Sequence, residues 1–142
     1  MNEYRYTLIV LLILIAGPLF ASEKLFLPNT GDTVLDESLV QINKKINKKS
    51  VRKLSQYTQQ LANDFQIPLY RVEELFNVYE FTAADVLMSV SIADVSGEPL
   101  KNVAGLYFKN KQSGWKAVLK QLMISPGSKV YQQIKKDAVA TY

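Results

Sequence analysis

The sequence has 142 residues and a formal net charge of +4, and it contains neither cysteine nor histidine. This length suits one domain with its own hydrophobic core. The missing residue types exclude disulfides, thiol redox chemistry, histidine-dependent nucleophilic catalysis and the usual zinc sites. The carboxylates show neither the pairing of a glycosidase nor the spacing of a calcium-binding loop. We therefore expect no enzymatic activity, no metal and no cofactor.

Residues 1–21 differ in composition from the rest of the chain. A short polar start leads into an unbroken apolar run over 8–16, which is shorter than the about 20 residues that span a bilayer. Gly17 and Pro18 would end a helix there, a pattern typical of a secretory signal peptide. We expect cleavage after Ala21 and export to the periplasm. Leu19 is unusual at its position before the cleavage site, so an uncleaved anchor in the inner membrane is the alternative.

Residues 22–33 contain Pro28, Asn29 and Gly31, which predict a flexible lead-in. From residue 34 to residue 142, apolar side chains recur three or four positions apart, as they do along one face of an α-helix. Such patterns begin near residues 34, 51, 68, 83, 99, 115 and 129. No segment predicts a strand, and the connections are short. The sequence thus predicts a single all-α domain, a compact orthogonal bundle of about six to seven short helices.

The segment over 82–97 is predicted to be the central helix. Thr82 and Asp85 resemble a capping box with Asp in place of Glu. Ser50 is likewise expected to be the N-cap of the helix that begins near residue 51. The helix that Thr82 opens is apolar on nearly every side, as is typical of a helix buried within a domain. Gly97 would end it. Gly105, inside the next helix, would permit a close helix crossing.

The predicted core is built from aliphatic residues of the central helix and aromatic residues that follow it. Its expected members are Val86, Leu87, Val90, Tyr107, Phe108, Trp115 and Leu119. The alternative for the aromatic side chains is that they line a ligand groove.

A cluster of positive charge interrupts an otherwise balanced distribution. Residues 43–53 include no acid and carry Lys44, Lys45, Lys48, Lys49, Arg52 and Lys53. Such a cluster can attract an acidic protein, an anionic lipid or an anionic polymer, or it can be a solvated helix end. Nucleic acid is not expected, because only Tyr57 lies near the cluster to stack on bases.

The stretch from Pro126 to Lys129 forms a break between the last two predicted helices. Pro126 and Gly127 would end one helix, and Ser128 would cap the next. Free amides at that helix start, together with Lys129, could instead hold an anion. The stretch lacks the glycine pair and the preceding strand of a phosphate-binding loop. Gly127, Ser128 and Lys129 are therefore either a capped corner or an anion site.

Several motifs over 36–136 together resemble a family of small, uncharacterised exported bacterial proteins. They are DESLVQIN, FQIP, AADVLMSVSIADVSGEPL, LYFKNKQSGW and LMISPGSKVYQQIKK. The resemblance implies an exported all-helical domain that ends in a Gly-Trp and Ile-x-Pro-Gly-Ser pattern, and it implies no established activity. Met123 stands where the family often has glycine, and Gln132 where it often has histidine.

These observations favour an exported, non-catalytic protein-interaction module that binds another envelope protein. The alternative is an electrostatic binder of anionic lipid or polymer through residues 44–53. The sequence predicts no oligomeric state.

Overall fold

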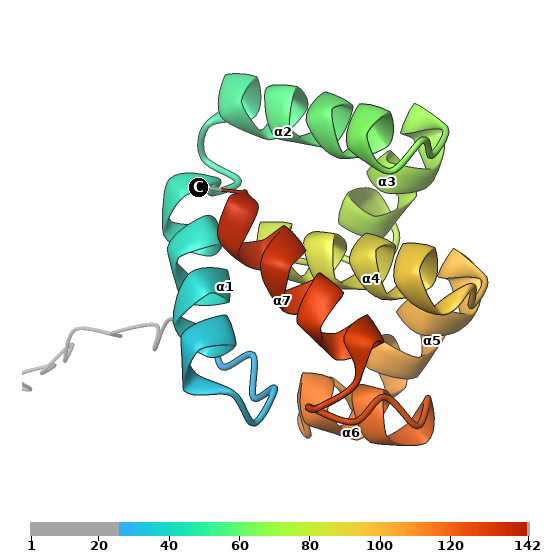
Figure 1. The fold of residues 1–142 in the computed structure, drawn as a ribbon. Helices are drawn as coiled ribbons and strands as arrows, with labels where there is room; N and C mark the ends of the chain where they lie inside the picture. Colours follow the sequence, from blue (N-terminus) through green and yellow to red (C-terminus); the bar gives the residue numbers. More distant parts are fainter. Residues whose placement is uncertain (1–25, 142) are drawn as a thin grey trace, which may run out of the picture.

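The computed structural model describes residues 26–141, which form seven α-helices and no strand (Figure 1). The helices are α1 (Thr33–Lys45), α2 (Val51–Asp64), α3 (Leu69–Asn77), α4 (Ala83–Ser96), α5 (Leu100–Asn110), α6 (Trp115–Gln121) and α7 (Lys129–Ala140). The predicted all-α bundle is confirmed. The expected signal peptide over 1–21 lies outside the described residues. Among residues 26–141, no helix is long and apolar enough to cross a membrane.

Helix α4 is the centre of the bundle. It contacts α1, α2, α3, α5 and α7, and Figure 1 shows α7 lying across it, with α2 and α6 at opposite ends of the molecule. Every residue over 83–92 is buried, including the predicted core members Val86, Leu87 and Val90. The apolar composition on all sides of this helix therefore has a direct structural cause, because other helices surround it.

The ends of α4 follow the sequence signals. The Thr82 hydroxyl accepts a hydrogen bond from the Asp85 amide, and the Asp85 carboxylate accepts one from the Thr82 amide, so the capping box is confirmed. Asn43 of α1 donates to the Thr82 hydroxyl and accepts from the Ala84 amide, which ties the two helices together. At the other end, Gly97 adopts a left-handed φ of 76°.

The aromatic core lies where α5 and α6 meet α4. Trp115 and Tyr107 stack with ring centroids 3.9 Å apart and planes 4° from parallel, and both are buried, as is Leu119. Phe108 was predicted to join them, and that prediction is wrong, because its side chain is 55% exposed. Successive helix residues rotate by about 100°, so a helix that directs Tyr107 inward turns Phe108 toward the edge of the bundle. There its ring meets Tyr79 edge-on.

Of two further local predictions, one holds in part and the other is wrong. Ser50 occupies the N-cap position of α2, as predicted, but its side chain makes no capping hydrogen bond. Gly105 does not permit a close helix crossing, because a Cβ built there would have no neighbour within 4 Å.

The start of α6 is capped by a distant part of the chain. The carbonyl oxygens of Pro28 and Asn29 accept hydrogen bonds from the amides of Trp115 (2.9 Å) and Lys116 (2.8 Å). Gly114 has φ 74°, and a Cβ there would lie 2.7 Å from the Pro28 oxygen, so only glycine fits. This part of the predicted lead-in is therefore held against the domain, and the contact explains the Gly-Trp pair.

Candidate functional site

The predicted basic cluster is exposed at each of its six cations. It spans the end of α1, the connection to α2 and the first turn of α2. We name it the basic surface; it comprises Lys44, Lys45, Lys48, Lys49, Arg52 and Lys53, all of which are exposed. The two lysines in the last turn of α1 also complement the negative end of the helix dipole.

Most cations of the basic surface form no ion pair with a described acidic side chain. The ion pairs that the structure shows among residues 26–141 join Arg71 to Glu74 and Lys135 to Asp32, and none of these residues belongs to the basic surface. Lys44, Lys48 and Lys49 take part in neither pair. Their charge is therefore directed to solvent, where it can attract an anion over about a Debye length.

A groove adjoins the basic surface between α2 and α3, with a volume of about 200 Å³. Its apolar lining comes from Val51, Leu54, Leu69 and Phe76, and five polar side chains, among them Glu73, complete it. Val51 is 78% exposed although it directly precedes Arg52 in the basic surface. The sequence analysis missed this groove, because its two walls come from different helices. An apolar residue at the first position of α2, next to the lysines, was the available signal.

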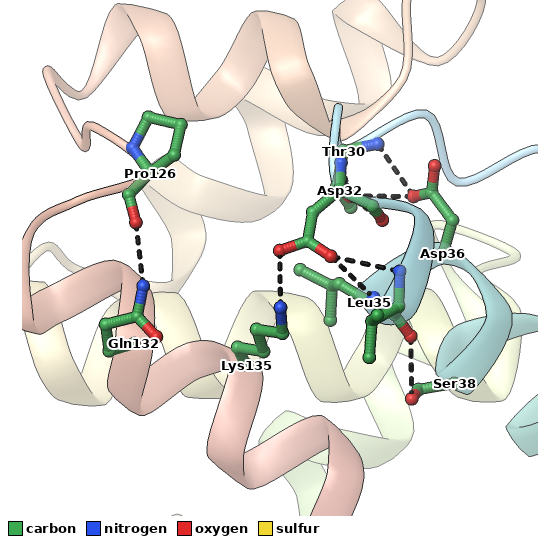
Figure 2. A network of polar contacts seen from close by, with 9 residues as sticks. Thr30, Asp32, Leu35, Asp36, Ser38, Pro126, Gln132 and Lys135 are labelled. Carbon is green, nitrogen blue, oxygen red and sulfur yellow. Dashed lines mark hydrogen bonds and ion pairs between the residues drawn. The ribbon is translucent and has the colours of Figure 1, made fainter.

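The corner between α6 and α7 is a well-bonded turn. The Ser128 hydroxyl accepts from the Tyr131 amide at 3.1 Å and donates to the Ser125 carbonyl, so the predicted cap is confirmed. Gln132 donates to the Pro126 carbonyl at 2.9 Å (Figure 2). Gly127 and Lys129 are exposed, and the anion site proposed for this corner stays a prediction.

A network of carboxylates joins the start of α1 to α7 (Figure 2). Asp32 caps α1 by accepting from the Leu35 amide at 3.1 Å, and it also accepts from the Lys135 ammonium at 2.7 Å. The hydrogen bond from Lys135 lowers the pKa of Asp32 below its ordinary value. Asp36 accepts from the amide and the hydroxyl of Thr30. These bonds occupy both carboxylates with structural partners.

Asp85 is the carboxylate that the sequence analysis assigned only to a cap. Its side chain is 1% exposed and accepts from the Trp115 indole at 3.1 Å and from the Thr82 hydroxyl at 2.9 Å. The Tyr107 hydroxyl lies beside it, and burial raises the pKa of Asp85. Perturbed carboxylates often mark active sites. Here the group is enclosed and hydrogen-bonded throughout, so it holds α4, α5 and α6 together instead.

The described residues offer no evident metal centre, since no group of three acidic side chains within 26–141 is placed to hold an ion. Comparison with family models, with curated proteins and with solved structures finds no match. The resemblance to an exported family therefore stays a prediction.

Proposed function

We propose that this protein is a non-catalytic interaction module that binds an acidic segment of an envelope protein through the basic surface. The observation that carries the proposal is the exposure of all six cations within residues 44–53, a segment that contains no acid. A binding segment with several carboxylates would meet complementary charge along two consecutive helices.

The adjoining groove favours a protein over a lipid or an anionic polymer. Protein interfaces combine apolar anchor side chains with a polar and charged rim. The basic surface supplies such a rim, and the groove beside Val51 and Leu69 has room for an anchoring side chain. A polymer of phosphates or uronic acids would use the charges and leave the groove empty.

The cellular place of this interaction follows from the N-terminal segment. With residues 1–21 acting as a cleaved signal peptide, the domain and its acidic partner would meet in the periplasm. With the segment uncleaved, the same domain would act at the surface of the inner membrane.

The test compares two triple charge reversals. Lys44, Lys48 and Lys49 are changed to Glu in one variant, and the exposed Lys101, Lys109 and Lys136 are changed to Glu in the control. Crosslinking in the envelope fraction identifies candidate partners, and binding of each purified partner is then measured at several salt concentrations. We expect the first variant to bind at least about tenfold more weakly, with affinity falling as salt rises, and the control to bind like wild type.

A further variant, Val51→Ser, separates protein from lipid. Weaker binding of this variant to the purified partner supports an apolar anchor in the groove. Binding to vesicles of anionic lipid that needs the lysines but not Val51 would favour the electrostatic alternative. Partner binding that survives reversal of Lys44, Lys48 and Lys49 would overturn the proposal.

A further inference from the structure

A second groove, of about 400 Å³, lies at the end of α2 that is farther from the basic surface. The end of α2, helix α3, the end of α4 and the start of α5 form its walls, and we name it the α3–α5 groove. Its apolar lining includes Phe65, Ile67, Leu75, Leu100 and Ala104. It shares no lining residue with the groove beside Val51, so the protein presents two separate grooves.

The chain around the α3–α5 groove is acidic. Outside the basic surface, acids and bases are segregated along the sequence, and Arg71 is the only base within residues 54–100. The acids of that stretch are Asp64, Glu73, Glu74, Glu80, Asp85, Asp94 and Glu98. The surface that α2, α3 and α4 present at this end of the molecule is therefore opposite in charge to the basic surface.

Three acids at the edge of the groove keep their charge. Asp94 lines the groove, and Asp64 and Glu98 directly precede two of its lining residues. None of the three takes part in an ion pair that the structure shows among residues 26–141. The cations of the lining are Arg71, which pairs with Glu74 at 3.4 Å, and Lys101. The edge of the groove is thus left with a net negative charge.

The charges at the two ends of α2 oppose its helix dipole. A helix favours acids in its first turn and bases in its last turn. Helix α2 instead has Arg52 and Lys53 in its first turn and Asp64 as its last residue. Helix α4 likewise has Asp94 in its last turn and no base there. Stability of the single helices does not account for this placement, whereas partners of opposite charge at the two ends would.

One copy of the chain cannot bring the two charged regions together. Figure 1 shows α2 crossing the molecule, with its first turn beside the end of α1 and its last turn on the side where α4 ends and α5 begins. The basic surface and the α3–α5 groove therefore lie on opposite sides. A second copy can supply the missing contact. Its basic surface offers six exposed cations and, directly before Arg52, the apolar Val51, which is 78% exposed.

We infer that the protein associates with itself head to tail, with the basic surface of one copy bound in the α3–α5 groove of the next. The cations of one copy meet Asp64, Asp94 and Glu98 of the other. Val51 and the aliphatic stems of the lysines cover the apolar lining. Because the two surfaces lie on opposite sides, the contact does not close on a twofold axis, and each copy binds two neighbours.

This inference shares the basic surface with the proposed function but needs no envelope partner. The test is sedimentation velocity of the purified protein alone, over a concentration series at low and at high salt. We expect the mean mass to rise with concentration at low salt, with a dissociation constant on the order of 100 µM. The mass should return to that of the monomer at high salt, because the interacting charges are exposed and become screened.

A first variant neutralises the basic surface. Lys48→Gln/Lys49→Gln/Arg52→Gln/Lys53→Gln should associate at least about tenfold more weakly than wild type. Its melting temperature should be equal or higher, because two of the removed charges oppose the dipole of α2. The matched control changes the same number of exposed lysines elsewhere and should associate like wild type. It is Lys109→Gln/Lys120→Gln/Lys129→Gln/Lys136→Gln.

A second variant neutralises the groove. Asp64→Asn/Asp94→Asn/Glu98→Gln should also associate at least about tenfold more weakly, although it raises the net positive charge only through residues far from the basic surface. An equal mixture of the two variants should form pairs with the affinity of wild type. In the mixture, the intact groove of the first variant binds the intact basic surface of the second, and the neutralised surfaces prevent longer chains.

Three results would overturn the inference. They are a monomer at every concentration up to about 1 mM at low salt, association that either variant leaves unchanged, and a mixture that stays monomeric. None of them affects the binding of an acidic envelope partner, which is measured separately. The groove variant should bind that partner at least as tightly as wild type, since it keeps the basic surface and loses the competing copy.

Discussion

The start of α4 and the corner between α6 and α7 differ in how completely their buried polar side chains are hydrogen-bonded. At α4, the Asp85 carboxylate is enclosed and accepts hydrogen bonds from Thr82 and Trp115. At the start of α7, the Tyr131 hydroxyl is enclosed beside Thr30 and Asp32 but makes no hydrogen bond of ordinary length and angle with the described residues. The helix ends differ similarly, because α4 ends on Gly97 and α6 ends on Met123 in the left-handed region (φ 55°). Left-handed residues other than glycine also follow α2 and α3, at Gln66 and Glu80, so backbone strain is not confined to this corner.

The largest expected effect tests the start of α4, where the buried carboxylate is fully hydrogen-bonded. Trp115→Ala removes a fully buried ring, its stacking on Tyr107 and a donor to Asp85. We expect the free energy of unfolding, measured in urea, to fall by about 3–5 kcal/mol. Phe108→Ala is the control on α5, where the half-exposed ring should cost about 1 kcal/mol or less. A near-wild-type melting temperature for Trp115→Ala would contradict the observed burial and make the Gly-Trp pair a candidate binding element.

Features that depend on neighbours in the sequence could be predicted. The capping box at Thr82 and Asp85, the cap at Ser128 and the burial of the central helix all follow from spacing within one segment. Phe108 shows the limit of such local patterns. It directly follows the buried Tyr107, and the apolar spacing was compatible with either residue facing the core.

Features that join distant segments could not be predicted. Pro28 and Asn29 cap α6 across more than eighty residues, and Thr30 meets Tyr131 only after α1 and α7 have packed. The concentration of positive charge over 44–53 could be read from the sequence directly. The groove between α2 and α3 could not, since its walls come from two helices whose arrangement no local pattern specifies.

A second prediction uses the opposite pKa shifts of the two capping aspartates. Burial raises the pKa of Asp85, so the folded protein holds that proton more tightly than the unfolded chain. The resulting stabilisation is fully present below the ordinary pKa of 3.8 and is lost as the pH rises through the folded value. Lys135 lowers the pKa of Asp32, whose stabilisation is present above 3.8 and is lost as the pH falls through the folded value.

Substitution separates these two contributions. Asp32→Asn keeps a good N-cap but loses the ion pair, so it should cost about 0.5–1 kcal/mol at neutral pH and almost nothing in strong acid. Asp85→Asn should remove the fall in stability with rising pH above 3.8. Urea unfolding across the acidic range measures both. Lys135→Met should reproduce the profile of Asp32→Asn, and the exposed Lys136→Met should not. Equal losses for Asp32→Asn at neutral and acidic pH would refute the role of the pair.

The smallest expected effect tests the corner between α6 and α7, where a non-glycine residue is left-handed. At the end of α6, the Ile124 amide bonds to the Leu119 carbonyl at 2.9 Å, which requires Met123 to be left-handed. Met123→Gly should relieve about 1–2 kcal/mol of strain and lose about 0.4–1 kcal/mol through the freer unfolded chain. A net gain of about 0.5–1 kcal/mol should therefore appear in urea unfolding. Gly97→Ala, with open space around its Cβ position, should cost a similar amount.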